Sequence, residues 1–236
     1  MLQKIETTGI GKCSIHGDYE IKSISIDGKI VFSDVINICP ECERIVMDVK
    51  KEKEKKLNLK KQNEKMLNNG VFKAYLNARI EDYKLETDIT IVKKFAEYPQ
   101  DKILVLYGKN GTGKTWLASA LCIQFCGLYF TMYNLTNKAF DSPKAKNIVR
   151  KKCHTTPLLV IDEIGKQSIT KAESNLFYDI INTRLGYELP TVLVSNLDKI
   201  QDFNNFVGLS IYDRLCQFGI YQELQHKSYR QRELFL

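Results

Sequence analysis

Gly108-Lys109-Asn110-Gly111-Thr112-Gly113-Lys114-Thr115 is the stretch that decides the fold of this chain. It fits the pattern G-x-x-x-x-G-K-[ST], in which glycines let backbone N–H groups close around phosphates without a Cβ clash. The apolar run Lys102–Tyr107 comes directly before it, and a helical pattern, Thr115–Phe125, begins at its end. Because the pattern binds phosphate where it joins a strand to a helix, this context is the required one. The sequence therefore predicts a P-loop nucleotide-binding fold.

Each residue type in this phosphate loop has a defined chemical task. The Lys114 ammonium is expected to reach the terminal phosphates of a nucleotide, and the Thr115 hydroxyl is expected to ligate Mg²⁺. The positive end of the helix that follows adds to the attraction for phosphate. A glycine turn without function is the alternative, and the strand before it and the helix after it argue against that interpretation. We therefore predict ATP and Mg²⁺ as ligands, with all eight residues of the loop contributing to the site.

Two further apolar runs end in polar residues that could act on a bound nucleotide. Asp162 and Glu163 follow Leu158–Ile161, and Asn196 comes shortly after Thr191–Val194. Such runs are typical of strands buried on both faces of a parallel sheet, whose carboxyl ends share the ligand side. We predict that Asp162 holds Mg²⁺ through water and that Glu163 orients and deprotonates the attacking water, which makes the chain an ATPase. Asn196 is predicted to hydrogen-bond the γ-phosphate or that water. The alternatives are an exposed acidic strand end and an ordinary turn asparagine.

The N-terminal part has the spacing of a metal site. Its C-x₂-H and C-x₂-C pairs are formed by Cys13, His16, Cys39 and Cys42. Four soft ligands suit a closed, tetrahedral structural Zn²⁺ site. Between the pairs, Tyr19–Ile26 and Lys29–Ser33 flank Asp27-Gly28, a strong signal for a tight hairpin. A module this small cannot build a sufficient core and needs a metal to hold it together. Accidental Cys and His residues in a β-rich segment are the alternative.

Length and composition set the frame for these motifs. The chain has 236 residues, 44% of them hydrophobic, and a formal net charge of +7. This length allows one α/β domain and a small appendage, and the charge suits contact with phosphate backbones or an acidic partner. The sequence has neither an apolar run near the roughly 20 residues of a membrane helix nor the layout of a secretion signal. The seven cysteines are odd in number and scattered, unlike a disulfide framework. We expect a cytoplasmic protein.

Composition divides the chain into three zones. Residues 1–48 are expected to form a zinc-binding module that contacts a partner, residues 49–85 a basic helical linker, and residues 86–236 the ATPase domain. The lysine-rich start of the linker favours a solvated helix or a tether, and a basic helix that touches nucleic acid is the alternative. In the last zone, apolar runs alternate with helical patterns such as Ala172–Arg184. This alternation predicts an α/β fold with a parallel sheet flanked by helices.

The motifs, taken in order, resemble those of the DnaC-type bacterial replicative helicase loaders, AAA+ ATPases of the DnaC/IstB-like family, many of them phage-borne. The resemblance covers essentially the whole chain. Besides the zinc-ligand pattern and the phosphate loop, it is carried by Asn77–Tyr83, Asp162-Glu163-Ile164-Gly165, Pro190–Leu197, Asp213-Arg214-Leu215 and Ser228-Tyr229-Arg230. The phosphate loop alone is generic, whereas these segments in this order are much more specific.

The resemblance implies an AAA+ fold and roles for single residues. Asn196 is similar to the family's first sensor, and Arg214 to its arginine finger, which completes the ATP site of an adjacent subunit. Arg230, and after it Arg184, are the candidates for a second sensor. A charge on a helix surface is the alternative for Arg214. The segment Tyr129–His154 departs from initiator-type members, in which helices here contact single-stranded DNA.

By the same resemblance, the expected function is to load a DnaB-type replicative DNA helicase onto single-stranded DNA, with ATP hydrolysis controlling release of the helicase. The implied partners are that helicase, single-stranded DNA and further copies of this chain, in a bacterium or its phage. The runner-up is a transposition-helper ATPase that acts with a transposase on duplex DNA, against which the zinc module argues. A phosphate loop also occurs in small-molecule kinases, against which Glu163 and the zinc module argue, and it would suit an adaptor that binds nucleotide without hydrolysing it.

Overall fold

The computed structural model describes residues 3–26, 29–33, 39–83, 89–99, 102–166, 168–197, 199–225 and 228. The chain divides into two compact units, Met1–Gln62 and Asn63–Leu236, each described by itself. The division falls within one helix, α1 (Pro40–Asn68), and the predicted module boundary at residue 48 lies inside the same helix. Among the described residues, no helix has the length and apolar character needed to span a bilayer.

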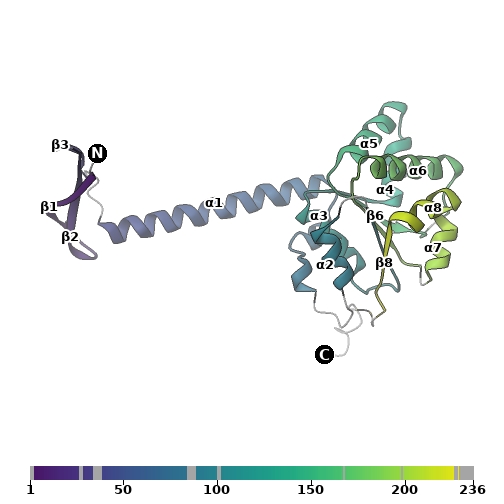
Figure 1. Ribbon diagram of the computed structural model, residues 1–236, viewed down its shortest axis with the longest axis horizontal. Coiled ribbons are helices and arrows are strands. Elements are labelled where there is room, and N and C mark those ends of the chain that lie inside the picture. The colour runs from purple at the N-terminus through teal and green to yellow at the C-terminus, as the bar shows by residue number, and fades with distance from the viewer. Residues whose placement is uncertain are drawn as a thin grey trace. The chain divides into compact units, whose positions relative to one another are not determined.

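The first unit contains an antiparallel three-stranded sheet, followed by the greater part of α1 (Figure 1). Its strands pair in chain order: β1 (Gln3–Cys13), β2 (Gly17–Ile26) and β3 (Lys29–Ser33). The two strands of the predicted hairpin are confirmed as β2 and β3, while its turn, Asp27-Gly28, lies outside the described residues. No strand is predicted over β1, because a register shift between Thr7 and Gly9 breaks the alternation on which such a prediction depends.

The helix α1 begins directly after Cys39 and runs for 29 residues. Pro40 occupies its first position, where a helix loses nothing by the missing N–H. Acidic residues lie in its first turn and Lys65 in its last, which complements the helix dipole. The side chains of its lysine-rich part are exposed, in agreement with a solvated helix. Met66, 1% exposed, anchors the last turn in the core of the second unit.

The second unit is built on a parallel sheet with strand order β5-β6-β7-β4-β8. Successive residues of its strands face opposite sides, so that Leu104 and Leu106 pack in one core while Ile103 and Val105 pack in the other. Both faces are therefore buried, as the continuous apolar runs predict. The strands are β4 (Ile103–Tyr107), β5 (Leu128–Thr131), β6 (Leu159–Ile164), β7 (Thr191–Ser195) and β8 (Gly219–Glu223).

Helices cover both faces of this sheet (Figure 1). One face carries the last turn of α1, two short 3-10 helices, η1 (Lys73–Tyr75) and η2 (Ile80–Asp82), and the helices α2 (Thr90–Glu97) and α3 (Lys114–Gln124). The other face carries α4 (Met132–Phe140), α5 (Pro143–Thr155), α6 (Lys171–Gly186), α7 (Ile200–Val207) and α8 (Leu209–Phe218). This layered arrangement confirms the predicted fold class of a parallel sheet flanked by helices.

Candidate functional site

The phosphate loop lies between β4 and α3, as predicted. Gly113 precedes the helix with φ +86°, in the left-handed region that favours glycine. Gly108 has φ +121° and also lacks space for a side chain, since an added Cβ would lie 2.6 Å from the carbonyl oxygen of Leu224. The loop therefore begins where the chain passes closely beside the segment that follows β8.

Lys114 points into this loop. Its Nζ donates to the carbonyl oxygens of Gly108 at 2.7 Å and Lys109 at 2.6 Å, and its side chain is buried. A buried ammonium lined by carbonyl oxygens holds positive charge at the centre of the loop, next to the N-terminus of α3. The geometry therefore places a cation and a helix dipole where the terminal phosphates of a nucleotide are expected.

Asp162 and Glu163 lie at a bulge in β6. The register between β6 and β7 shifts between Ile161 and Ile164, and Glu163 has φ +62°, an uncommon value for a residue with a side chain. Bulges of this kind re-aim side chains, and they are frequent next to active sites. The bulge lets two adjacent residues differ in environment, because Asp162 is buried while Glu163 is partly exposed.

The carboxylate of Asp162 meets the phosphate loop. Its Oδ2 accepts hydrogen bonds from the Thr115 hydroxyl at 2.9 Å and from the Tyr129 hydroxyl at 2.5 Å, and its Oδ1 accepts one from the backbone N–H of Glu163 at 2.6 Å. Burial raises the pKa of Asp162, and these three donors act in the opposite direction. Thr115 and Asp162 are 47 residues apart and together present the oxygen ligands that Mg²⁺ prefers.

Glu163 is held by a neighbouring lysine. The Lys166 ammonium lies 2.8 Å from its Oε1, and this contact raises the pKa of Lys166. The pair is largely exposed, so its contribution to stability is small. The carboxylate thus lies near the carboxyl end of β6, at the same edge of the sheet as the phosphate loop.

Asn196 directly follows β7 at the same edge and is half-buried. The residues before and after it, Ser195 and Leu197, hydrogen-bond to the end of β6 and to the phosphate loop, respectively. Ser195 Oγ donates to the carbonyl oxygen of Ile164 at 2.8 Å, and the carbonyl oxygen of Leu197 accepts from the Gly108 N–H at 3.3 Å. The structure therefore places Asn196 between the phosphate loop and the acidic strand end.

The three predicted arginines have different surroundings. Arg214 lies on α8, is half-buried and makes no ion pair within the described part of the chain. Arg230 lies outside the described residues. Ser228, from the same motif, lies against Gly111 of the phosphate loop, where an added Cβ would clash with its hydroxyl oxygen. The motif that contains Arg230 thus begins beside the loop.

Arg184 is not a nucleotide sensor, and this candidate is wrong. Its side chain is 0% exposed, and burial lowers its pKa to about 10. The guanidinium donates four hydrogen bonds, to the carbonyl oxygens of Cys153, Thr156 and Pro190 and to the Thr191 hydroxyl. Because Thr191 begins β7, this cluster lies at the amino ends of the strands, on the edge opposite the phosphate loop. Arg184 therefore links the end of α5 to the start of β7 by hydrogen bonds at that edge.

Two tyrosines contact the site without having been predicted to do so. The Tyr83 hydroxyl donates to the carbonyl oxygen of Thr112 in the phosphate loop at 2.8 Å, and its ring packs 5.9 Å from that of Trp116. Tyr83 ends the segment Asn77–Tyr83, which carries the family resemblance but no assigned role. Tyr129 reaches Asp162 from β5, and no pattern in the sequence marks it.

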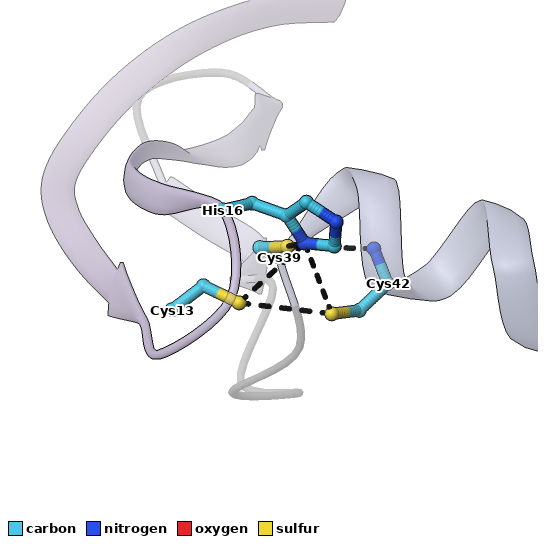
Figure 2. Close-up of side chains that lie close together, drawn as sticks. All are labelled: Cys13, His16, Cys39 and Cys42. Carbon is cyan, nitrogen blue, oxygen red and sulfur yellow. Dashed lines mark hydrogen bonds between the residues drawn. The ribbon is translucent and has the colours of Figure 1, made fainter.

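A second cluster lies in the first unit. Figure 2 shows Cys13, at the end of β1, and His16, in the turn before β2, facing Cys39, just before α1, and Cys42 in its first turn. Within the described residues, these four form the one group of at least three His, Cys, Asp or Glu side chains able to hold a metal ion. Backbone N–H groups of Ile15 and His16 hydrogen-bond to Cys13 and lower the pKa of its thiol to about 6. Hydrogen bonds with the thiols of Cys39 and Cys13 raise the pKa of the Cys42 thiol.

The distances in this cluster fit zinc. Cys13 Sγ lies 3.6 Å from Cys42 Sγ, and the His16 Nδ1 atom lies 3.3, 3.3 and 3.7 Å from the Sγ atoms of Cys39, Cys42 and Cys13. At the usual Zn–S and Zn–N lengths of about 2.3 and 2.1 Å, the corners of a tetrahedral site are about 3.5–3.8 Å apart. The four side chains therefore fit one structural Zn²⁺, which would supply cross-linking and no catalysis.

We predict that the purified protein carries one zinc ion per chain and that the first unit depends on it. A structural zinc contributes about 10–16 kcal/mol to the folding of modules this small. Replacing Cys39 and Cys42 together with serine should therefore abolish zinc content by mass spectrometry and expose the amides of β1 and β2 to hydrogen exchange. ADP binding by the second unit should stay within about twofold of wild type, because no zinc ligand lies there. Loss of both properties together would contradict two independent units.

Comparison with known proteins gives consistent matches. The family model described as IstB-like ATP binding protein matches residues 28–234. The replicative helicase loader DnaC of Buchnera aphidicola subsp. Schizaphis graminum is 27% identical over 185 residues, which cover 69% of this chain and 73% of that protein. The insertion sequence IS21 putative ATP-binding protein of Pseudomonas aeruginosa is 25% identical over 142 residues, covering 55% and 53% of the two chains. The crystal structure of DnaI superposes with a TM-score of 0.56 and 22% identity over 66% of this chain and 95% of that one, a likeness of fold.

Proposed function

The chain belongs to the family of IstB-like ATP-binding proteins, and from this premise we propose that it is an ATPase that loads a replicative DNA helicase onto single-stranded DNA. The observation that carries the ATPase assignment is the meeting of Thr115 and Asp162 beside the buried Lys114. The loader assignment is supported by the resemblance of most of the chain to replicative helicase loaders of the DnaC type.

In this proposal the residues at the ligand edge divide the work of ATP hydrolysis. Lys114 and the loop N–H groups bind the β- and γ-phosphates, and Thr115 and Asp162 hold Mg²⁺, which neutralises phosphate charge. Glu163 turns from Lys166 to a water molecule, orients it and accepts its proton, while Asn196 fixes the γ-phosphate or that water. The different environments of the two adjacent acids suit these two tasks, since a buried carboxylate is fixed and a partly exposed one can move.

Arg214 is proposed to act on a neighbouring copy of the chain. It lies half-buried on α8 without an ion-pair partner in the described part of the chain. A guanidinium supplied from one subunit to the ATP of the next can accelerate hydrolysis by about 10³–10⁵-fold. The rate of ATP hydrolysis would then depend on self-association and would show whether the loader has assembled.

The zinc-stapled first unit is proposed to contact a DnaB-type helicase. Positive net charge and exposed aromatic residues are suited to holding the single strand onto which the helicase is placed. ATP hydrolysis would then control release of the helicase.

Arg230, from the motif whose Ser228 lies against the phosphate loop, is proposed as the second sensor of nucleotide state.

A transposition helper is the second candidate, favoured by the similarity to the IS21 ATP-binding protein. The two functions differ in the DNA that they use. We expect phosphate release by the purified protein to be stimulated several-fold more by single-stranded DNA than by duplex DNA of the same sequence. Stimulation by duplex alone would favour the transposition helper and contradict the loader.

A further inference from the structure

Tyr129 is the donor to Asp162 that belongs neither to the phosphate loop nor to β6. It lies on the neighbouring strand β5, 33 residues earlier in the chain, and its hydroxyl lies 2.5 Å from Asp162 Oδ2. Both side chains are nearly inaccessible, with 2% of Tyr129 and 3% of Asp162 exposed. A hydrogen bond to a buried carboxylate is strong, and water cannot readily replace it.

The position of Tyr129 is fixed independently of this hydrogen bond. Its backbone N–H donates to the carbonyl oxygen of Asn69 at 2.8 Å, and Asn69 Nδ2 donates to the neighbouring carbonyl of Gly127 at 2.8 Å. Gly70, with φ +95°, passes so close that an added Cβ would clash with the carbonyl oxygen of Tyr129. The ring of Phe72 meets the Tyr129 ring edge to face, with centroids 5.8 Å apart. The segment after α1 therefore holds β5 and the tyrosine ring in place.

This arrangement constrains the orientation of the Asp162 carboxylate. Oδ1 is held by the Glu163 N–H, and Oδ2 is shared by the Thr115 and Tyr129 hydroxyls. Thr115 is expected to turn its oxygen toward Mg²⁺ when nucleotide binds, so its hydrogen bond alone cannot define where Oδ2 lies. The Tyr129 hydroxyl comes from β5 and not from the phosphate loop, so it can keep Oδ2 in one place throughout.

We propose that Tyr129 is a positioning residue, which holds the Asp162 carboxylate in the orientation that Mg²⁺ with nucleotide requires. The inference rests on the proposed function, because it assumes that Thr115 and Asp162 bind Mg²⁺. Partners that orient a metal-binding carboxylate from behind typically change metal affinity by about 10–100-fold when they are removed. The effect should therefore fall on magnesium rather than on the nucleotide.

The test is a magnesium titration of the full chain with ADP bound, followed by tryptophan fluorescence. Trp116 is the chain's one tryptophan and comes directly after Thr115, so it reports on this site. Tyr129→Phe keeps the ring and removes the hydroxyl. The matched control is Tyr133→Phe, the same change at a residue of α4 that is 55% exposed. Phe72→Leu leaves the hydroxyl in place and loosens the ring contacts of Phe72 with Tyr129 and Tyr75.

Tyr129→Phe is expected to weaken magnesium affinity at least about tenfold, while ADP binding in the presence of a chelator stays within about twofold of wild type. Tyr133→Phe should match wild type, and Phe72→Leu should show a smaller weakening than Tyr129→Phe. Magnesium affinity of Tyr129→Phe equal to wild type would overturn the inference. So would equal weakening of ADP binding with and without magnesium, which indicates a merely structural role. Absence of magnesium-dependent ADP binding by the wild type would instead contradict the proposed ATPase itself.

Discussion

Replacing Lys114 with alanine is expected to abolish ATP turnover and nucleotide binding. The ammonium is buried within the phosphate loop, where it donates to the carbonyl oxygens of Gly108 and Lys109. Alanine removes the positive charge and leaves these carbonyls without that donor, so the loop loses both its attraction for phosphate and part of its internal support. We expect phosphate release to fall at least about 10²-fold and ADP affinity to fall with it.

The matched control for this variant is Lys144→Ala, at an exposed position near the start of α5 and outside the site. It removes the same charge and should leave DNA-independent turnover unchanged. Calorimetric titration measures the ADP affinity of both variants, and a phosphate-release assay measures their ATP turnover. Turnover of Lys114→Ala at the rate of the control would contradict the assignment of Gly108–Thr115 as the phosphate loop.

Glu163→Gln is expected to bind ATP with near wild-type affinity and to hydrolyse it about 10²–10⁴-fold more slowly. Glutamine has the same length and can still hydrogen-bond a water molecule, but it cannot accept its proton. It also lacks the charge that pairs with Lys166, a contact too exposed to matter for stability. The variant should therefore accumulate in the ATP-bound state.

A suitable control exists because Glu188 is also a glutamate with positive φ, at +56°, in the turn after α6. Glu188→Gln makes the same chemical change in the same backbone region, away from the ligand edge. In single-turnover experiments, Glu163→Gln should hydrolyse ATP about 10²–10⁴-fold more slowly than Glu188→Gln. The melting temperatures of the two variants should agree. Rapid hydrolysis by Glu163→Gln would mean that another group activates the water.

The parts of the fold that could be predicted are those whose signal is local. The phosphate loop, with β4 before it and α3 after it, is contained in a short window of sequence, and the cysteine pairs carry their metal geometry in a two-residue spacing. By contrast, β5 has four residues, and β8, with the sequence Gly-Ile-Tyr-Gln-Glu, contains no long apolar run. Both strands form because neighbouring strands and helices cover them, which is a tertiary effect.

The features that could not be predicted depend on contacts between residues far apart in the sequence. The Tyr129–Asp162 hydrogen bond joins two strands, and its partners become neighbours only when β5 pairs with β6. Arg184 misleads for a related reason, since a fully buried arginine is rare and its four acceptors come from the end of α5 and the start of β7, which only the fold brings together. The roles of Arg214 and Arg230 depend on a second subunit or on residues outside the described part, and they stay predictions.

The most direct test of the loader proposal is co-elution of the purified protein with a hexameric bacterial replicative helicase from the same host on a sizing column, with Mg²⁺ and ATP. We predict a stable complex that the joint replacement Cys39→Ser and Cys42→Ser destroys, because the zinc-stapled first unit is proposed to make the contact. No complex between the wild-type chain and that helicase would contradict the loader function, while the ATPase predictions for Lys114 and Glu163 could still hold.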